Sequence, residues 1–483
     1  MIRRALFIMV SAAIVSACAA PAGREVVAEP EIYPDYKGVT VPLGIAPLDF
    51  TMADSLVSSV DVSVSGPSGS LCSRGRSYTR FPIRRWHRLL KASAGQTLRV
   101  TVRAKRGGEW TTYKPFSINV SEDPSDYGLV YRKLAPGYIS YSKMGIYERD
   151  LSSFRERALI ENTSFSGCVN CHTSNRANPD EFSLHIRGAR GATLLRANGA
   201  MDAYETKTDS TSGFCVYPYW HPSGKYIAYS INTTRQAFHE GPDKIIEVFD
   251  HESDLGVYDV DNGRLLLPPS LKGDQRWETF PAFSADGKTL FFCAATPRPI
   301  PDSLAAIRYN LLKTDFDPST GAVGSVIETV INAESDGKSV SFPRPSYDGK
   351  YLMYTLSDYG NFSIWHHEAD LWLFDMETGE SRPLDEVNSE DTESFHNWDS
   401  SSRWFVFSSR RDDGLHTRLY LCHINGNGVC DKPFMLPQRD PGRYYNSLFL
   451  SFNAPEFVAH PSPFQSRRAA RLINSDARTP FKL

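Results

Sequence analysis

The 483-residue sequence is poor in the residues that bind metals or form disulfide bonds, and it has no excess of either charge. It contains only 8 cysteines, 12 histidines and 8 methionines, so any cluster of these residues is informative. The formal net charge of −3 argues against a nucleic acid or a strongly acidic molecule as the main partner. No stretch is apolar over the roughly twenty residues that a transmembrane helix needs.

Aromatic residues, glycine and proline are plentiful instead, with 33 glycines and 31 prolines. This composition favours a mainly β fold with many short strands and tight turns. Apolar and polar residues alternate with a period of two at 57–64, 98–103 and 113–120, which predicts half-buried strands. We expect residues 37–124 to form a small β-sandwich domain that acts as a spacer.

The N-terminus has the features of an export signal. Arg3 and Arg4 precede an apolar run at 5–15, and Val-Ser-Ala-Cys follows at 15–18. This pattern predicts a signal peptide over 1–17 and a lipidated Cys18; an ordinary secretory signal is the alternative. Residues 18–36 are polar and without periodicity, which predicts a flexible tether. The expected location is the periplasmic side of the cell envelope, as a lipoprotein of the outer membrane by preference.

Residues 168–172 read Cys-Val-Asn-Cys-His, the C-x-x-C-H signature of covalent c-type haem attachment. At this spacing Cys168 and Cys171 form thioethers with one haem, and His172 supplies an axial nitrogen to its iron. A zinc site is the alternative, but it needs a second Cys or His pair, and the sequence offers none. The motif therefore predicts one covalently attached haem c.

Three further residues are candidates for the haem site. A second axial ligand is expected from His185, which lies on an alternating stretch; Met144, next to a glycine, is the alternative. Arg187 follows on the same strand face as His185 and is a candidate partner for a haem propionate. Residues 154–160 are expected to form a short helix that leads into the motif.

The remaining cysteines are odd in number, so at least one has no partner within a monomer. They are Cys72, Cys215, Cys293, Cys422 and Cys430. Cys422 and Cys430 flank an Asn-Gly-Asn-Gly turn at 425–428, where a disulfide is possible, although buried thiols are the preferred interpretation.

The second half of the chain repeats. The segments 216–229, 279–292 and 341–354 align on an aromatic-proline pair followed by Ser/Asp-Gly-Lys, and 394–407 is a degenerate fourth copy. A period of roughly fifty to sixty residues is typical of propeller blades with long loops. We expect first propeller strands within the haem segment 125–215, repeats over 216–457, a tail at 458–483, and a closing strand near 447–452. Together these predict a propeller of roughly six blades that carries a small haem-binding insertion.

The repeated Phe-Pro-x-aromatic-(Ser/His)-x-Asp-Gly-Lys pattern resembles the periplasmic TolB-like propellers. Five segments carry a second resemblance: 144–149, the C-x-x-C-H motif, 185–187, 432–438 and 453–457. This combination resembles a family of Bacteroidetes lipoproteins described as TolB-like or cytochrome-c-type. This resemblance implies architecture and haem, and it supplies no substrate.

Three functions remain open. The first is a lipid-anchored periplasmic cytochrome that passes single electrons to a redox partner protein docked on the propeller. The second is a haem-dependent oxidoreductase with its substrate in the propeller channel. The third is a non-catalytic scaffold for envelope proteins. A closed sixth iron position favours the first, and an open one favours the second.

Overall fold

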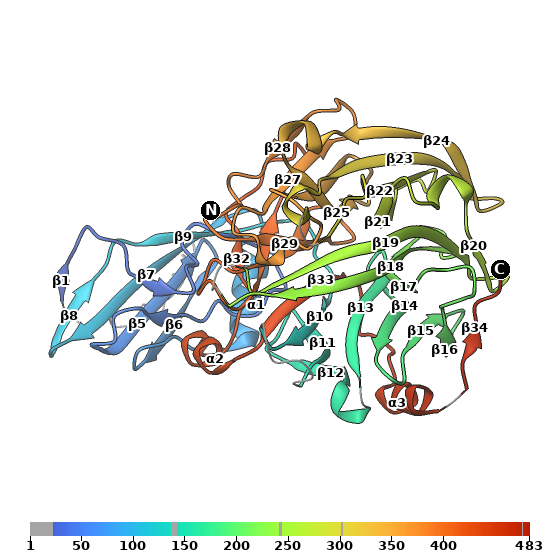
Figure 1. Ribbon diagram of the computed structural model, residues 1–483. Helices are drawn as coiled ribbons and strands as arrows, with labels where there is room; N and C mark the ends of the chain where they lie inside the picture. The colour runs from blue at the N-terminus through green and yellow to red at the C-terminus, as the bar shows by residue number, and fades with distance from the viewer. Residues whose placement is uncertain (1–22, 137–142, 166, 241–243, 301–302, 476) are drawn as a thin grey trace, which may run out of the picture.

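The computed structural model describes residues 23–136, 143–165, 167–240, 244–300, 303–475 and 477–483. The chain is mainly β, as predicted, with an N-terminal sheet on one side of a set of further sheets (Figure 1). The described residues contain no helix that is both long and apolar enough to span a bilayer.

The N-terminal region contains one large sheet and one small sheet. The large sheet comprises β1 (Arg24–Glu25), β3 (Thr40–Val41), β5 (Val57–Gly66), β6 (Gly69–Gly75), β7 (Thr97–Arg106), β8 (Glu109–Thr112) and β9 (Phe116–Val120), and the small sheet pairs β2 (Ile32–Tyr33) with β4 (Thr51–Met52). Alternation predicted β5, β7 and β9, and every second residue of β7 from Leu98 to Ala104 is buried.

A helix that the sequence analysis did not predict packs within this region. In α1 (Ile83–Ala92) the buried residues are Trp86, Leu89 and Leu90, at the three- and four-residue spacing of one helix face. The Trp86 indole N–H donates to the backbone oxygen of Ile45 at 3.1 Å. The region is thus a seven-stranded sheet with a small sheet and a helix, where we expected a simple two-sheet sandwich.

Six sheets make up the rest of the described residues, and they are antiparallel except for one parallel strand pair. In spatial order they contain β12 (Glu156–Glu161), β11 (Gly145–Asp150), β10 (Gly128–Leu134) and β33 (Ser451–Val458); β13 (Cys168–Asn175), β14 (Asn178–Arg187), β15 (Ala192–Ala197), β16 (Ala200–Glu205) and β34 (Thr479–Pro480); β17 (Phe214–Trp220), β18 (Tyr226–Phe238), β19 (Ile246–Asp259) and β20 (Arg264–Leu266); β21 (Trp277–Phe283), β22 (Thr289–Ala295), β23 (Tyr309–Asp317) and β24 (Ala322–Ile331); β25 (Ser339–Pro345), β26 (Tyr351–Ser357), β27 (Asp370–Asp375) and β28 (Ser381–Pro383); and β29 (Glu393–Trp398), β30 (Trp404–Ser409), β31 (Arg418–His423) and β32 (Phe434–Met435).

The inner strands of these sheets contact one another in a cyclic order. β33 touches β13, and contacts continue through β17, β21, β25 and β29 back to β33. β33 comes from the C-terminal part of the chain and pairs antiparallel with β10, so one sheet joins early and late strands. The closing strand begins at Ser451, slightly later than the predicted 447–452. This arrangement is that of a β-propeller-like ring.

Two local predictions near the motif were wrong. Residues 154–160 do not form a helix, because β12 (Glu156–Glu161) pairs with β11 over this segment. The motif is not an insertion either: 168–172 lies in β13, the inner strand of its sheet. Pairing with a neighbouring strand decided both cases, and short-range sequence pattern does not report such pairing.

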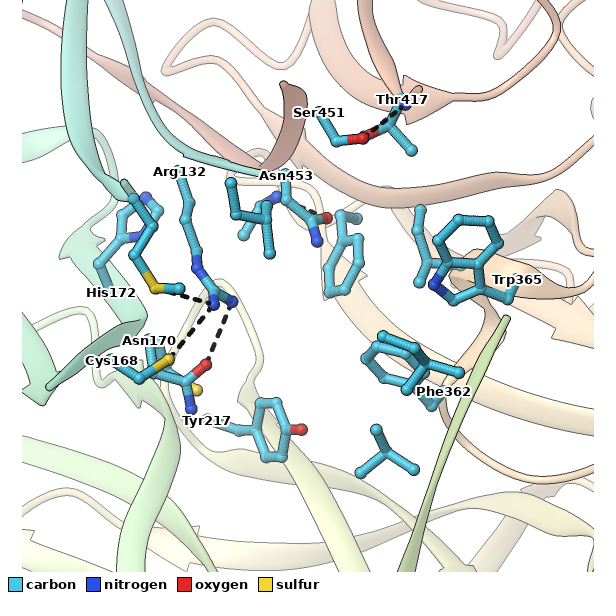
Figure 2. Close-up of a pocket in the computed structure, with 18 of the residues that line it drawn as sticks. Arg132, Cys168, Asn170, His172, Tyr217, Phe362, Trp365, Thr417, Ser451 and Asn453 are labelled. Atoms are coloured by element: carbon cyan, nitrogen blue, oxygen red, sulfur yellow. Dashed lines mark hydrogen bonds between the residues drawn. The ribbon is translucent and has the colours of Figure 1, made fainter. Parts of the chain in front are cut away.

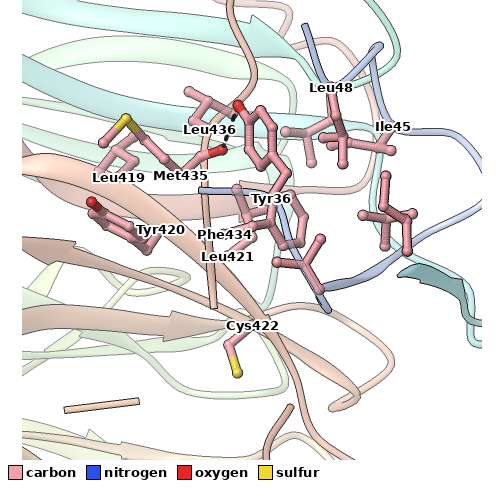
Figure 3. Packing of buried hydrophobic residues seen from close by; sticks show 14 of the residues in the cluster. Tyr36, Ile45, Leu48, Leu419, Tyr420, Leu421, Cys422, Phe434, Met435 and Leu436 are labelled. Atoms are coloured by element: carbon pink, nitrogen blue, oxygen red, sulfur yellow. Dashed lines mark hydrogen bonds between the residues drawn. The ribbon is translucent and has the colours of Figure 1, made fainter. Parts of the chain in front are cut away.

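Residues 24–36 do not form the predicted flexible tether. β1 and β2 pair within the N-terminal sheets, and Tyr36 is fully buried. Its hydroxyl donates to the backbone oxygen of Met435 at 3.4 Å. Figure 3 shows Tyr36 beside residues of β31 and β32, with Ile45 and Leu48 farther out in the same cluster, so one hydrophobic core spans the N-terminal region and the last ring sheet.

The C-terminal residues 458–483 are also integrated rather than a free tail. α3 (Ser466–Asn474) buries Ala469 and Ile473, and β34 pairs with β16 as a fifth strand. Phe481 stacks on Tyr258 with ring centroids 3.9 Å apart. α2 (Pro441–Ser447) lies between β32 and the closing strand β33.

Candidate functional site: a cavity at the haem-attachment motif

Every inner strand of the ring carries a β-bulge at the corresponding place. The irregular pairs are 217–218, 280–281, 342–343, 395–396, 454–455 and 170–171. In five strands the first bulge residue has a positive φ, between 45° and 52°: Tyr217, Phe280, Phe342, Phe395 and Ala454. A bulge places two residues opposite one and re-aims their side chains. The repeated aromatic-proline pair of the sequence is therefore the bulge of β17, β21 and β25.

The C-x-x-C-H motif occupies this same position in β13. Val169 pairs with Ile186 and His172 pairs with Leu184, so Asn170 and Cys171 form the bulge. The motif is thus the inner-strand segment of a ring sheet, with Asn170-Cys171 in place of the aromatic-proline pair. Sequence reasoning missed this position because the segment has neither an aromatic residue nor proline at the bulge. The similarity to β17 is limited to Val169, which precedes its bulge as Val216 does.

The aromatic bulge residues form a row of rings in contact, in edge-to-face or tilted arrangements. The ring centroids of Tyr217 and Phe280 are 4.7 Å apart, those of Phe280 and Phe342 are 4.2 Å apart, and those of Phe342 and Phe395 are 4.6 Å apart. The two other bulges contribute Ala454 and Asn170, which are smaller. The row of aromatic rings therefore has a gap at β33 and β13, where the motif lies.

A cavity of about 710 Å³ lies at this opening. Cys168, Cys171 and His172 line it on one side, and Phe362 and Trp365 face them across the space (Figure 2). Its walls include further apolar side chains, from the β18–β19 hairpin and the loops after β26 and β30: Phe238, Ile246, Val248, Ile364 and Leu415. Large apolar walls with a few convergent polar groups are typical of cofactor and ligand sites.

The chemical state of the motif side chains allows them to bind a cofactor. Cys168 and Cys171 are unpaired thiols. His172 is 6% exposed, and neither of its ring nitrogens meets the geometry of a hydrogen bond with a described group. Burial lowers the pKa of His172 to about 4, against a smaller opposing effect from the backbone of Val130, so its ring is neutral at pH 7. A neutral, buried imidazole without a hydrogen bond is suited to metal ligation.

Arg132 connects the motif to Met144. Its guanidinium nitrogens lie 3.3 Å from the Asn170 side-chain oxygen, 3.6 Å from the Cys168 sulfur and 3.9 Å from the Met144 sulfur (Figure 2). Met144 is buried and lines the same cavity. The structure thus brings the alternative ligand Met144 together with the motif, and it adds Arg132, which the sequence analysis did not identify.

The preferred sixth ligand, His185, lies elsewhere. It is adjacent to Leu184 in β14, and Leu184 pairs with His172; neighbouring strand residues point to opposite faces. His185 lines a separate chamber and does not line the motif cavity. Its ring packs near Phe214, with centroids 5.6 Å apart. The expected His172–His185 pair is therefore not assembled in this structure, because alternation in the sheet separates the two side chains.

Arg187 lines both the motif cavity and that chamber. Its charge opposes the burial that raises the pKa of the Cys171 thiol, and it adds to the burial that lowers the pKa of His185 to about 3. Arg344 and Arg410 also line the motif cavity. With Arg132 and Arg187, four arginine side chains of the described residues therefore border the space, and Arg187 remains a candidate partner for a carboxylate there.

The other predicted sites have simpler outcomes. Cys18 lies outside the described residues. Cys422 and Cys430 are free, buried thiols. In the described part of the chain no three His, Cys, Asp or Glu side chains are grouped to hold a bare metal ion.

Comparisons with known proteins add the following. No family model matches the chain, and no curated protein matches it. An oligogalacturonate lyase from Vibrio parahaemolyticus is 12% identical, with a TM-score of 0.35 over 60% of this chain and 70% of that one. A DUF4784 family protein from Bacteroides caccae is 11% identical, with a TM-score of 0.31 over 74% and 95%. The β-propeller domain of Cps50 (Swd1) from Myceliophteria thermophila is 11% identical, with a TM-score of 0.31 over 70% and 93%. At these TM-scores the similarities carry no argument about activity, substrate or cofactor.

Proposed function

We propose that this protein is a mono-haem c-type cytochrome that carries single electrons, with its haem in the cavity beside β13. The observation that supports the proposal is the placement of the whole motif at one cavity: two free thiols and a buried histidine without a hydrogen bond all line it. The 710 Å³ cavity falls within the roughly 300–1,000 Å³ range of sites for compact ligands and cofactors.

The residues around the cavity fit a haem. Cys168 and Cys171 would hold it as thioethers, and His172 would offer its neutral ring nitrogen to the iron. Phe362 and Trp365 provide an apolar wall for a flat macrocycle and exclude water from it. Arg132 and Arg344 line the cavity and supply positive charge for propionate groups. A bound haem supplies a one-electron couple at its iron.

Met144 is the candidate for the second axial position. Its sulfur and the Cys168 sulfur contact the same guanidinium nitrogen of Arg132, so the thioether lies next to the attachment site. Methionine as the second ligand raises the reduction potential relative to histidine. We therefore propose His-Met ligation in place of the bis-histidine ligation that the sequence favoured.

A haem-dependent oxidoreductase is the second candidate function. The observation that favours it is the extent of the cavity, which reaches from the motif to the β18–β19 hairpin and to Leu415. Such a space leaves room for a substrate beside a cofactor. Membrane anchoring through Cys18 and a redox partner protein remain part of the first proposal.

The visible spectrum tests both candidates. The full chain is produced with an export signal in a strain that attaches haem c, and spectra are recorded oxidised, reduced, and reduced with carbon monoxide. A covalent haem whose reduced spectrum ignores carbon monoxide supports the electron carrier. Carbon monoxide binding supports the oxidoreductase, because it requires an open iron position.

A variant in which both motif cysteines are replaced (Cys168→Ser with Cys171→Ser) is the matched control. It should fold, since serine is nearly isosteric with cysteine, but carry no covalent haem. Replacing the buried cysteine outside the motif, Cys215→Ser, should leave haem content unchanged. Absence of covalent haem from the parent protein would rule out the proposal and leave the propeller-like scaffold.

A further inference from the structure

A second chamber lies next to the motif cavity and contains two buried polar atoms without partners. The side chamber, of about 220 Å³, is lined by residues of β14, β17 and β18 and the turn after β14, among them His185, Arg187, Phe214, Asn232 and Thr234. Arg187 and Thr234 line the motif cavity as well. Its volume exceeds what one or two water molecules fill.

The first unpartnered atom belongs to His185. This side chain is 2% exposed, and its Nδ1 lies 3.0 Å from the Thr193 hydroxyl oxygen. The Nε2 atom has no hydrogen-bond partner among the described residues. Because leaving a buried polar atom unpaired costs free energy, Nε2 is suited to a group on a bound molecule. A hydroxyl group fits, since it can donate to or accept from either tautomer of the ring.

The second unpartnered atom is the side-chain oxygen of Asn232, which is 8% exposed. The amide nitrogen of Asn232 donates to Asp250 at 2.7 Å and to Thr279 at 3.2 Å. Asp250 is fixed in turn by the Tyr309 hydroxyl at 2.7 Å and the Asn361 amide at 2.6 Å. An ionised Asp250 accepts hydrogen bonds only, so it holds the NH₂ group of Asn232 and leaves the carbonyl oxygen without a donor.

Arg187 adds a positive charge to these neutral groups. No ion pair within 4.0 Å involves it among the described residues, and its charge acts on His185. A molecule that satisfies all three groups carries a carboxylate for Arg187 and hydroxyls for His185 and Asn232. We infer that the side chamber is a binding site for a small hydroxylated carboxylic acid, with Arg187, His185 and Asn232 as its polar contacts.

This site does not depend on the haem. None of its polar contacts belongs to the motif, and the network that orients Asn232 runs through Asp250 of the same sheet to Tyr309 and Asn361, outside the motif strand. The side chamber nevertheless shares Arg187 and Thr234 with the motif cavity. A bound carboxylate would therefore lie beside the proposed redox centre, as a substrate or an effector would.

Calorimetric titration of the purified full chain with glycerate tests the inference. Glycerate carries one carboxylate and two hydroxyls, and we expect one site per chain. Glycerol lacks the carboxylate and acetate lacks the hydroxyls, so each should bind at least about tenfold more weakly. Ring-labelled histidine resonances of His185 should shift with glycerate, which a non-specific surface site would not cause. Equal binding of glycerol and glycerate, or no binding of glycerate at millimolar concentration, would overturn the inference.

Two arginine variants, one on β14 and one on β18, locate the site. Arg187→Gln should weaken glycerate binding at least about tenfold, because it removes a charge-assisted hydrogen bond. Arg235→Gln removes an exposed cation next to Thr234 and should leave binding unchanged. Equal affinities of the two variants would contradict the assigned site. Haem content is measured on the same samples, and the double motif variant Cys168→Ser with Cys171→Ser should retain glycerate binding, so failure of the haem proposal stays distinguishable. A crystal structure with glycerate that shows only ordered waters in the chamber would also overturn it.

Discussion

His172 and Met144 show how single residues gain a role from their surroundings. His172 is neutral because burial lowers its pKa to about 4, and its nitrogens lack hydrogen bonds. Met144 is a buried apolar side chain by composition, but its sulfur lies at Arg132, which also contacts Cys168. The same type of argument removes His185 from the motif cavity, since its neighbour Leu184 pairs with His172.

Replacing Met144 with leucine tests its assignment at the residue scale. Met144→Leu keeps the side-chain volume but removes the sulfur, so the haem-loaded variant should bind carbon monoxide when reduced. Its reduction potential should fall, because a thioether ligand favours the reduced iron. Met201 is buried in the same hydrophobic cluster but does not line the motif cavity, so Met201→Leu should change neither property. An unaltered spectrum in Met144→Leu together with an altered one in His185→Ala would restore bis-histidine ligation.

At the scale of elements, β13 and β33 decide where the site lies. Both are inner strands with a bulge. Their bulge residues, Asn170 and Ala454, are not aromatic and leave a gap in the row of aromatic rings. Glu456 of β33 links the two strands, because its carboxylate accepts the backbone N–H of Ser174 at 2.8 Å. Burial raises the pKa of Glu456 to about 7, against the hydrogen bonds that it accepts from Thr173 and Ser174.

Glu456 should therefore make the strand junction pH-dependent. With a folded pKa of about 7 against the ordinary glutamate pKa of 4.5, the folded chain retains a proton that the unfolded chain has released between these pH values. The free energy of unfolding falls as pH rises through this window. Glu456→Gln stays neutral and can still accept from Ser174, so at pH 8 it should be more stable than the parent by about 1–3 kcal/mol.

Denaturant unfolding at pH 5 and at pH 8 measures this effect. The gain should be small at about pH 5, where Glu456 is protonated in the folded chain. The exposed Glu252 provides the control, and Glu252→Gln should change stability little at either pH. A gain of equal size at both values would show that the carboxylate charge is not its cause.

On the scale of the whole molecule, the N-terminal region and the ring share one core. Tyr36 packs with residues of the last ring sheet, and the cluster continues through Ile45 and Leu48 into the N-terminal strands (Figure 3). Lys432 bonds Asp35 across the same junction at 2.8 Å. A continuous core couples the two parts, so they should unfold together.

Removing the Tyr36 side chain tests this coupling. Tyr36→Ala leaves a cavity in the shared core and should lower the free energy of unfolding by about 3 kcal/mol. Scanning calorimetry should show one transition, shifted as a whole. Leu56 is 61% exposed in the same region, and Leu56→Ala should cost at most about 0.5 kcal/mol. Two separate transitions in the parent would show that the parts fold independently.

His423 gives the junction a second pH dependence. Its Nε2 lies 2.7 Å from Asp123 and its Nδ1 lies 2.8 Å from Asp431. Burial lowers the pKa of His423, but the hydrogen bonds and charges of Asp431 and Asp123 outweigh it, and the net pKa is raised above 6.5. The stabilisation is complete below the unfolded pKa and is lost as pH rises through the folded pKa.

The melting temperatures of the parent and His423→Gln should therefore converge as the pH rises from 6.5 into the alkaline range. His416 lies 2.8 Å from Asp413 of the same loop, so His416→Gln serves as a comparison for a local histidine–carboxylate pair. A difference between parent and His423→Gln that stays constant over this range would exclude a role for the imidazolium.

The sequence alone determined the strands, the repeat and the motif. Alternation in 98–103, the aromatic-proline repeat and C-x-x-C-H at 168–172 are local patterns that neighbours in the chain specify. The tertiary structure decided the rest. Asn170 and Cys171 fall in a bulge through pairing with β14, Met144 reaches the motif through Arg132, and Tyr36 finds its partners in β31 and β32. Each of these contacts joins residues whose pairing depends on sheet register and ring closure, which no short segment of the sequence encodes.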